Sequence, residues 1–278
     1  MNNNFYSPFK SAVYRFVWVA MFFSNIGTWA HTVTSSLVMT QLTNSATLIA
    51  LVQTFAMLPV FLFAIPAGVL ADLHDRRRII ICAQILMALI ALCMSFGVYS
   101  GHMVPSTLLA MTFLLNIGFA FNQPAWQAFA STFIPSTELK QAAALNNLSF
   151  NISRCIGPAI AGFYFSKLGP GFLFLLNSVS FLGMIWVLSF KTRAQPKLER
   201  NINIHQICGA LKSTFNFINE YPLLKSILCK SSIYFLLASC LWAALPYIVI
   251  TFHHMSNSNL GLLISAAGVG AVLNALYL

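Results

Sequence analysis

Charged residues are scarce in this sequence, and acidic residues are scarcer still. Asp, Glu, Lys and Arg make up 7% of the 278 residues, with five acidic side chains in all, whereas 58% of the chain is hydrophobic. Soluble chains usually carry about 25% charged residues. So few charges cannot cover a folded globule of this length, which excludes an ordinary soluble domain and predicts that the lipid bilayer covers much of the surface.

Three long stretches, 16–71, 79–137 and 231–278, contain no charged residue at all. Each is far longer than the roughly 20 apolar residues that cross a bilayer, so each must fold back on itself. The breaks are marked by Asn, Ser, Gly and Pro. The pattern predicts an all-α, polytopic membrane helix bundle with spans at 15–38, 47–71, 79–99, 105–129, 141–165, 171–190, 226–250 and 260–278.

The basic residues fall almost entirely in every second loop. Thirteen of the 15 precede or begin the first span, lie in the 72–78 and 130–140 loops or lie between 191 and 230. This bias predicts a multi-pass protein with a cytoplasmic N-terminus. It also explains the net charge of +10 better than nucleic-acid binding does, so we expect no nucleic-acid partner.

The polar segment 191–225 divides the predicted spans into six and two. We expect one unit over 1–190, a cytoplasmic linker over 191–225 and an incomplete second unit over 226–278. Within the linker, apolar residues recur every three or four positions between Ile204 and Ile218, which predicts an amphipathic helix near the membrane surface.

Other motifs are missing too. The sequence has no G-x-x-x-x-G-K-[ST] loop, which argues against ATP as the energy source. It has no C-x-x-C pair, and no nucleophile–base arrangement stands out. We therefore expect no catalytic residues, no metal and no cofactor. A membrane-embedded enzyme is the weakest of the functional alternatives.

The most specific segment is 68–78, with the sequence GVLADLHDRRR. It resembles the loop between spans two and three of the major facilitator superfamily, G-x-L-x-D-R-x-G-R-R/K. Leu73 replaces the usual Arg and Asp75 the usual Gly. The resemblance implies a conformational latch between two halves of a transporter, formed by Gly68, Asp72, Asp75, Arg76 and Arg77. The arginines also serve as a topology anchor.

A second segment, 146–162, resembles the fifth-span antiporter motif of exporters, G-x-x-x-G-P-x-x-G-G, through Arg154, Gly157, Pro158 and Gly162. A Gly-Pro pair bends a helix, and small residues let a neighbour pack against the bend. Segments such as 24–29 and 122–127 also fit the siderophore (enterobactin-type) and macrolide efflux branch. The resemblance implies a six-span N-terminal half followed by about two spans of a second half.

Arg154 stands inside a predicted span, where an arginine costs at least about 2.5 kcal/mol unless it faces a cavity or a partner. Asn147, Asn151 and Arg154 share one helix face. Two readings remain open for Arg154. It either faces the pathway and binds an anionic or carbonyl-rich substrate, or donates hydrogen bonds to helix carbonyls that lock the spans together.

Span one carries a polar stripe that includes Asn25, Trp29 and His31. Because the first span lines the central pathway in the family, we expect these residues to line it here, together with Asn147, Asn151 and Arg154. Ordinary hydroxyl packing between helices explains the Ser and Thr residues of the stripe equally well. A buried His31 without a pH-sensing role is the alternative for that residue.

The function indicated is proton-coupled efflux of a small molecule, such as a drug or siderophore, by a secondary transporter in the inner membrane. None of the five acids lies inside a predicted span, where proton-coupled exporters usually carry a carboxylate. Twelve spans are expected of the family. We therefore expect that residues 1–278 alone do not transport, and a truncated, non-transporting remnant or scaffold is the alternative.

Overall fold

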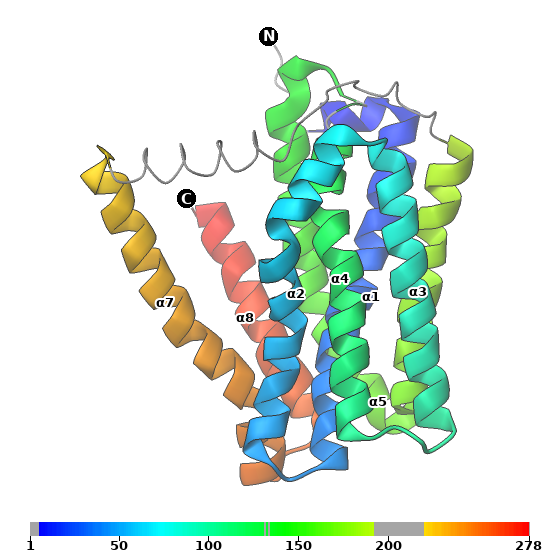
Figure 1. Ribbon diagram of the computed structural model, residues 1–278, viewed down its shortest axis with the longest axis vertical. Coiled ribbons are helices and arrows are strands. Elements are labelled where there is room, and N and C mark those ends of the chain that lie inside the picture. Colours follow the sequence, from blue (N-terminus) through cyan, green and yellow to red (C-terminus); the bar gives the residue numbers. More distant parts are fainter. Residues whose placement is uncertain (1–5, 131, 133, 192–219, 278) are drawn as a thin grey trace.

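The computed structural model describes residues 6–130, 132, 134–191 and 220–277, and these residues contain helices and no strands. The helices in chain order are η1 (Ser7–Lys10), α1 (Ala12–Leu42), α2 (Ala46–Leu73), α3 (Arg76–Tyr99), α4 (Pro105–Ala130), η3 (Ser136–Glu138), α5 (Leu139–Lys191), α7 (Pro222–Pro246), η4 (Tyr247–Phe252) and α8 (Asn257–Tyr277) (Figure 1). The predicted all-α fold class is confirmed, and helices lie at each of the predicted spans as far as residue 277.

Local sequence signals set where the helices begin. Ser11, Ser45 and Asp75 cap α1, α2 and α3, and each side chain accepts a hydrogen bond from a backbone N–H in the first turn of its helix. Pro105 and Pro222 stand at the start of α4 and α7, where the missing proline N–H costs nothing. The polar breaks between apolar stretches therefore act as helix starts.

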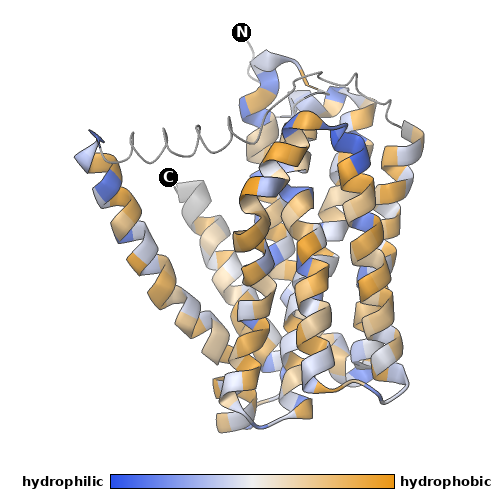
Figure 2. Ribbon diagram, viewed as in Figure 1, coloured by the Kyte–Doolittle hydropathy of each residue, from blue (hydrophilic) through white to orange (hydrophobic). Residues whose placement is uncertain are grey.

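Five helices of the described residues are long and apolar enough to cross a membrane: α2, α3, α4, α5 with η3, and α7 with η4. Large apolar side chains point outward on them, among them Phe61 at 82% exposure and Phe96 at 74%. Figure 2 shows the hydrophobic residues along the middle of the helices. An exposed surface of this kind fits hydrocarbon, whereas in water it would promote aggregation.

The long α5 contains two of the predicted spans. Its helical geometry breaks at Gly169, where φ is +80° and ψ is 160°, and Pro170 follows. Glycine adopts a positive φ of this kind readily, whereas other residues are strained by it. The chain reverses there, so that the two segments of α5 run antiparallel (Figure 1).

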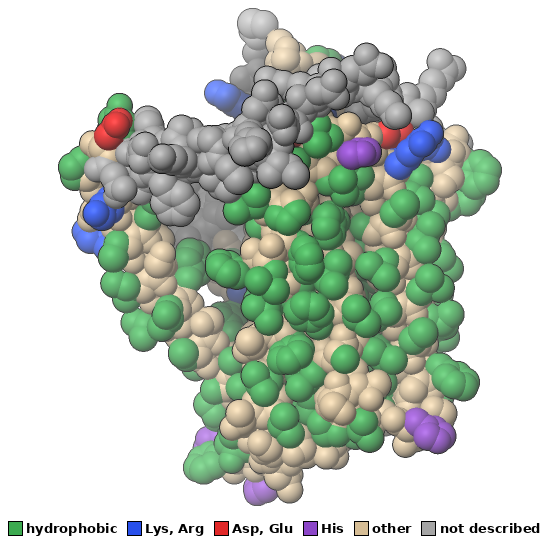
Figure 3. All heavy atoms as spheres, in the orientation of Figure 1, with side chains coloured by type: hydrophobic (Ala, Val, Ile, Leu, Met, Phe, Trp, Pro, Cys, Tyr) green, Lys and Arg blue, Asp and Glu red, His purple; other side chains and the backbone are tan. Residues whose placement is uncertain are grey.

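The Lys and Arg side chains visible in Figure 3 lie at one end of the bundle. This end, which we call the basic end, carries the beginnings of α1, α3, α5 and α7, with Arg15, Arg76–Arg78, Lys140 and Lys225. The opposite end carries the turns around Gly101, Gly169 and His254. The observed arrangement has the charge asymmetry that the sequence predicts between alternate loops.

Glycines bring α5 into close contact with α1 on one side and α8 on the other. A Cβ atom on Gly157 would lie 2.6 Å from the Cβ of Trp29, and one on Gly162 would lie 2.8 Å from the carbonyl oxygen of Asn257 and 2.9 Å from the Cα of Gly261. The Ser258 hydroxyl donates to the Gly162 carbonyl at 3.2 Å. Small residues therefore build both interfaces, as is common between helices in lipid.

The apolar core differs between the two ends of the bundle. At the opposite end, one buried cluster joins residues of α1 and α2, such as Leu37 and Ile49, to Val249 of η4 and Leu260 of α8. Near the basic end, the described cluster around Val17 and Phe129 contains no residue of α7 or α8. In Figure 1, α7 leans away from the bundle toward this end. The six-span part and α7–α8 are thus packed together at the end opposite the basic residues.

The predicted amphipathic helix at 204–218 lies outside the described residues. The division into units at 1–190, 191–225 and 226–278 therefore stays a prediction, although α5 ends at Lys191 and α7 begins at Pro222.

Replacing Gly162 by leucine tests the packing of α5 against α8. The new side chain meets backbone atoms, which cannot rotate away, so we expect a loss of about 1–3 kcal/mol. Thermal unfolding of the purified chain in detergent should then show a melting temperature lower by roughly 2–4 °C per kcal/mol. The matched control is Gly183→Leu, also on α5, because no atom lies within 4 Å of its Cβ position. Equal melting temperatures for the two variants would contradict this packing.

Candidate functional site

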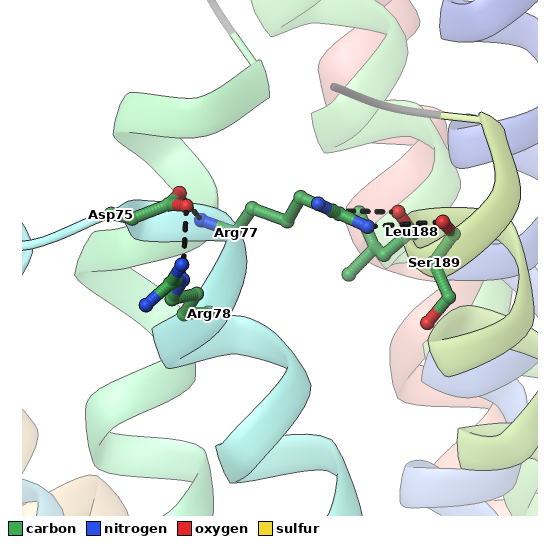
Figure 4. Close-up of polar contacts among 5 residues, drawn as sticks. All are labelled: Asp75, Arg77, Arg78, Leu188 and Ser189. Atoms are coloured by element: carbon green, nitrogen blue, oxygen red, sulfur yellow. Dashed lines mark hydrogen bonds and ion pairs between the residues drawn. The ribbon is translucent and has the colours of Figure 1, made fainter. Parts of the chain in front are cut away.

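The connection between α2 and α3 places Asp75 as the cap of α3. Its Oδ1 accepts a hydrogen bond from the Arg77 N–H at 3.0 Å, and its Oδ2 lies 3.6 Å from Nε of Arg78 (Figure 4). Asp75 is buried, with 9% exposure, whereas the Arg78 side chain is 77% exposed. The aspartate that replaces the usual glycine of the motif therefore satisfies a free N–H group at the helix start.

Arg77 connects the start of α3 to the end of α5. Its Nε donates to the Leu188 carbonyl at 2.8 Å, and its Nη2 donates to the Ser189 carbonyl at 3.0 Å (Figure 4). These carbonyls belong to the last turn of a helix, which leaves its final C=O groups without intrahelical partners and carries partial negative charge. Arg77 thus supplies the hydrogen bonds and the positive charge that this helix end requires.

Arg76 makes a similar contact with α4. Its Nη1 donates to the Ala128 carbonyl at 3.3 Å, and its Nε donates to the Ala71 carbonyl at 3.2 Å. Its Nη2 also lies 3.9 Å from an oxygen of Asp72, whose side chain is 67% exposed. A pair this long and this exposed adds little stability. The contacts of Arg76 and Arg77 thus join α3 to α2, α4 and α5, whereas those of Asp75 lie within the first turn of α3.

Gly68 does not lie at a close contact between described helices. No atom lies within 4 Å of a Cβ built on this residue. It therefore makes no close helix contact within the described residues. Of the antiporter-like motif, Gly157 and Gly162 pack against α1 and α8, and Pro158 between them is buried.

A cavity of about 600 Å³ lies between α1, α4 and α5. Carboxamides from all three helices line it, and three aromatic rings complete the wall; these residues are Asn25, Gln123, Gln127, Asn146, Asn147, Trp18, Trp126 and Phe150. Among the residues that the structure describes, no Asp, Glu, Lys or Arg lines it. Trp18 lies in the second turn of α1 and Leu139 in the first turn of α5, so the cavity lies in the half of the bundle near the basic end.

Hydrogen bonds between α1 and α5 fix the cavity wall. The Tyr14 hydroxyl lies 3.3 Å from Oδ1 of Asn146 and 3.4 Å from the Ala142 carbonyl, and the Trp18 indole N–H donates to the Leu145 carbonyl at 3.3 Å. Deeper in the bundle, the Ser153 hydroxyl donates to the Phe22 carbonyl at 3.3 Å. The wall therefore offers hydrogen-bonding groups and aromatic faces, which suit the uncharged polar groups and the apolar parts of an amphipathic molecule.

The residues that the sequence suggested for the pathway fall into two groups. Asn25 and Asn147 line the cavity, whereas Trp29, Asn151 and Arg154 lie outside its lining. Asn151 donates to the Asn147 carbonyl at 2.9 Å. His31 is buried, with its ring centroid 4.8 Å from that of Phe174, so it lies within the helix packing rather than on the cavity wall.

That Arg154 binds a substrate stays a prediction. Its buried Nε has no hydrogen-bond partner in the described part of the chain, so no helix carbonyl accepts from this atom. Instead its guanidinium carbon lies 5.5 Å from the ring centroid of Trp29 and 5.1 Å from that of Trp242. Two tryptophans, from α1 and α7, thus flank the cation.

Comparison with known proteins gives the family. The family model described as transmembrane secretion effector matches residues 3–278. The chain belongs to this family of major facilitator transporters. The expected resemblance to the siderophore and macrolide efflux branch is thereby confirmed, and the family is one of transporters rather than enzymes.

The individual relatives that the chain matches have low sequence identity. Macrolide efflux protein A of Streptococcus pyogenes is 27% identical over 128 residues, which are 46% of this chain and 32% of that protein. Enterobactin exporter EntS of Citrobacter koseri is 24% identical over 270 residues, 95% of this chain and 62% of that protein. The chain therefore spans less than two-thirds of the length of these relatives.

A solved structure has the same fold. A bacterial homolog of the human lysosomal transporter Spinster, crystallised in an inward-facing and unoccupied conformation, superposes with a TM-score of 0.72 over 98% of this chain and 63% of its own length. Its sequence is 16% identical, so the likeness concerns the fold alone.

Several cavity residues were not identified as site residues from the sequence. Gln123 and Gln127 lie in a segment that resembles the family, yet nothing in their spacing separates a cavity wall from a helix end. Asn146 begins the segment 146–162 but occupies no motif position, and Trp18 lies in no motif-bearing segment. A count of carboxamides near the ends of the first, fourth and fifth spans would have found this group, because carboxamides are costly inside lipid without partners.

Removing the Arg77 side chain tests its role at the end of α5. Arg77→Gln loses the charge-assisted hydrogen bonds to Leu188 and Ser189, and we expect a cost of about 1–2 kcal/mol in thermal unfolding in detergent. Arg78→Gln is the control, since that exposed side chain has one long ion pair and should change stability by less than about 0.5 kcal/mol. If both variants unfold at the same temperature, the contact with α5 has no stabilising role.

Proposed function

We propose that this chain forms the substrate cavity of a secondary active exporter in the bacterial inner membrane, with its N-terminus in the cytoplasm. The exporter moves a small amphipathic molecule outward and takes up protons in exchange, without ATP. The observation that carries the proposal is the cavity between α1, α4 and α5, near the basic end. Positive charge marks the cytoplasmic side of membrane proteins, so a substrate would enter this cavity from the cytoplasm.

The packing of the opposite end supports the same proposal. There α5 and α8 meet through Gly162 and Gly261, and a shared apolar core joins α1 and α2 to η4 and α8. A transporter works by alternating access, in which one side of a central site is closed while the other is open. The arrangement corresponds to a state that is closed outward and accessible from the cytoplasm.

The loop between α2 and α3 serves in this proposal as the conformational latch. Asp72 is exposed and only loosely paired with Arg76, so its carboxylate can accept a partner from the second half when the cytoplasmic side closes. Asp75, Arg76 and Arg77 meanwhile keep the loop fixed to the six-span part. Gly68, with open space around it, leaves room for a helix to approach.

The relatives suggest the test substrate. The enterobactin exporter aligns with 95% of this chain, so enterobactin is the substrate to test. The measurement is the amount of enterobactin secreted by cells that lack their own exporter. Residues 1–278 are produced alone or together with the part of that exporter beyond the aligned region. We expect secretion only from the combined chains, at least about tenfold above the vector control, and abolished by a protonophore.

A cavity variant makes this test specific. Gln123→Ala with Asn147→Ala removes two carboxamides from the wall, and the lost hydrogen bonds should lower secretion by about tenfold. The control is Asn116→Ala, since Asn116 on the same α4 donates to the Thr112 carbonyl and does not line the cavity. Absence of secretion from the combined chains would favour the non-transporting remnant, and secretion by residues 1–278 alone would overturn the expectation that the second half is required.

A further inference from the structure

The guanidinium of Arg154 lies between two indole rings from different helices. Its carbon atom is 5.5 Å from the centroid of Trp29 on α1 and 5.1 Å from the centroid of Trp242 on α7. Arg154 itself projects from the middle of the first segment of α5, three residues before Gly157. The cation and both rings are therefore held by three helices that the fold brings together.

This contact leaves the hydrogen-bonding capacity of the arginine unused. The Nε atom is buried, and no hydrogen-bond partner lies within reach in the described residues. Cation–π attraction stabilises the charge but satisfies none of the N–H groups. Arg154 as a whole is half-buried, but its buried, unpaired Nε–H carries a desolvation cost. A site of this kind favours any anion that can reach it.

The described acids do not supply that anion. Asp72, Asp75, Glu138 and Glu220 all lie at helix ends near the basic end, and the two recorded ion pairs involve only the arginines of the loop between α2 and α3. Within the described residues, Arg154 is thus a cation in the membrane-spanning part of α5 with aromatic neighbours and no carboxylate.

The position is adjacent to the cavity. Phe150, one turn before Arg154 on α5, lines the cavity, and its ring contacts that of Trp29 at a centroid distance of 5.6 Å. Aromatic contact therefore connects the cavity wall to the Arg154 region. The carboxamides of the cavity would hold its uncharged polar groups, and Arg154 a negative group at its inner end.

We propose that Trp29, Arg154 and Trp242 form a binding site for a planar aromatic anion, such as an aromatic carboxylate or phenolate. The anionic oxygens accept hydrogen bonds from the planar, fork-shaped guanidinium, which matches a carboxylate, and the aromatic ring stacks against indole. The inference deepens the proposed function, because it assigns a chemical class to the substrate of the same cavity. Binding would also involve α7. Trp242 flanks the guanidinium, so its side chain must shift when a ligand binds there.

The test measures binding rather than transport. Purified residues 1–278 in nanodiscs are titrated with 4-fluorobenzoate, observed by fluorine NMR, and compared with 4-fluorobenzamide, which has the same shape and no charge. Empty nanodiscs give the lipid background. We expect 4-fluorobenzoate to bind at least about tenfold more tightly than the amide, a difference of one charge-assisted interaction.

Variants locate the site. Arg154→Gln should weaken 4-fluorobenzoate binding at least tenfold and leave the amide unchanged, and Trp242→Leu, which keeps the cation, should weaken binding about threefold. The control is Lys167→Gln, which removes another cation–aromatic pair, with Phe163 at 3.8 Å, without affecting the site. Unchanged benzoate binding in Arg154→Gln, or equal binding of benzoate and amide to the unaltered chain, would overturn the proposal.

The two proposals fail separately. Specific benzoate binding without enterobactin secretion would keep the anion site and reject the proposed exporter. Secretion together with charge-independent binding would keep the exporter and reject the anion site. If Arg154→Gln fails to fold, the comparison of acid with amide and the Trp242→Leu variant still decide the outcome.

Discussion

The close approach of α5 to its two neighbours is the constraint on which the rest of the molecule depends. No hydrophobic force draws helices together in lipid, so contact between small residues decides where they meet. Gly157 packs closely against α1, and Gly162 packs closely against Gly261 of α8. These contacts fix the rotation of α5, and with it the direction of Asn147 toward the cavity and of Arg154 toward the two tryptophans.

The two ends of the bundle follow from the same contacts. At the end opposite the basic residues, glycine packing and an apolar core hold α8 and η4 against the six-span part. At the basic end, arginines hold α2, α3, α4 and α5 to one another through helix-end carbonyls, while α7 leans away. Hydrogen bonds thus join the helices around the cavity, whereas α7, which carries Trp242, leans away from them at this end.

The sequence predicted the helices well, because the cost of burying charge in hydrocarbon confines Lys, Arg, Asp and Glu to helix ends. It also located Gly169 within the break between the fifth and sixth spans. The sequence could not predict which side chains contact one another across helices. Arg154 and Trp242 are far apart in sequence, and the spacing of residues does not indicate which face of α7 lies toward α5. For the same reason His31, polar by type, was expected on the pathway and lies buried against Phe174.

The most direct test of this account asks from which side the cavity is accessible. In a chain whose native cysteines are replaced, Asn147→Cys is labelled with a membrane-impermeant maleimide in vesicles of known orientation. His74→Cys and His102→Cys, both exposed, mark the basic and opposite ends. The account predicts that the reagent labels position 147 from the side that labels position 74. Labelling from the side of position 102 alone, or no labelling of position 147 from either side, would contradict it.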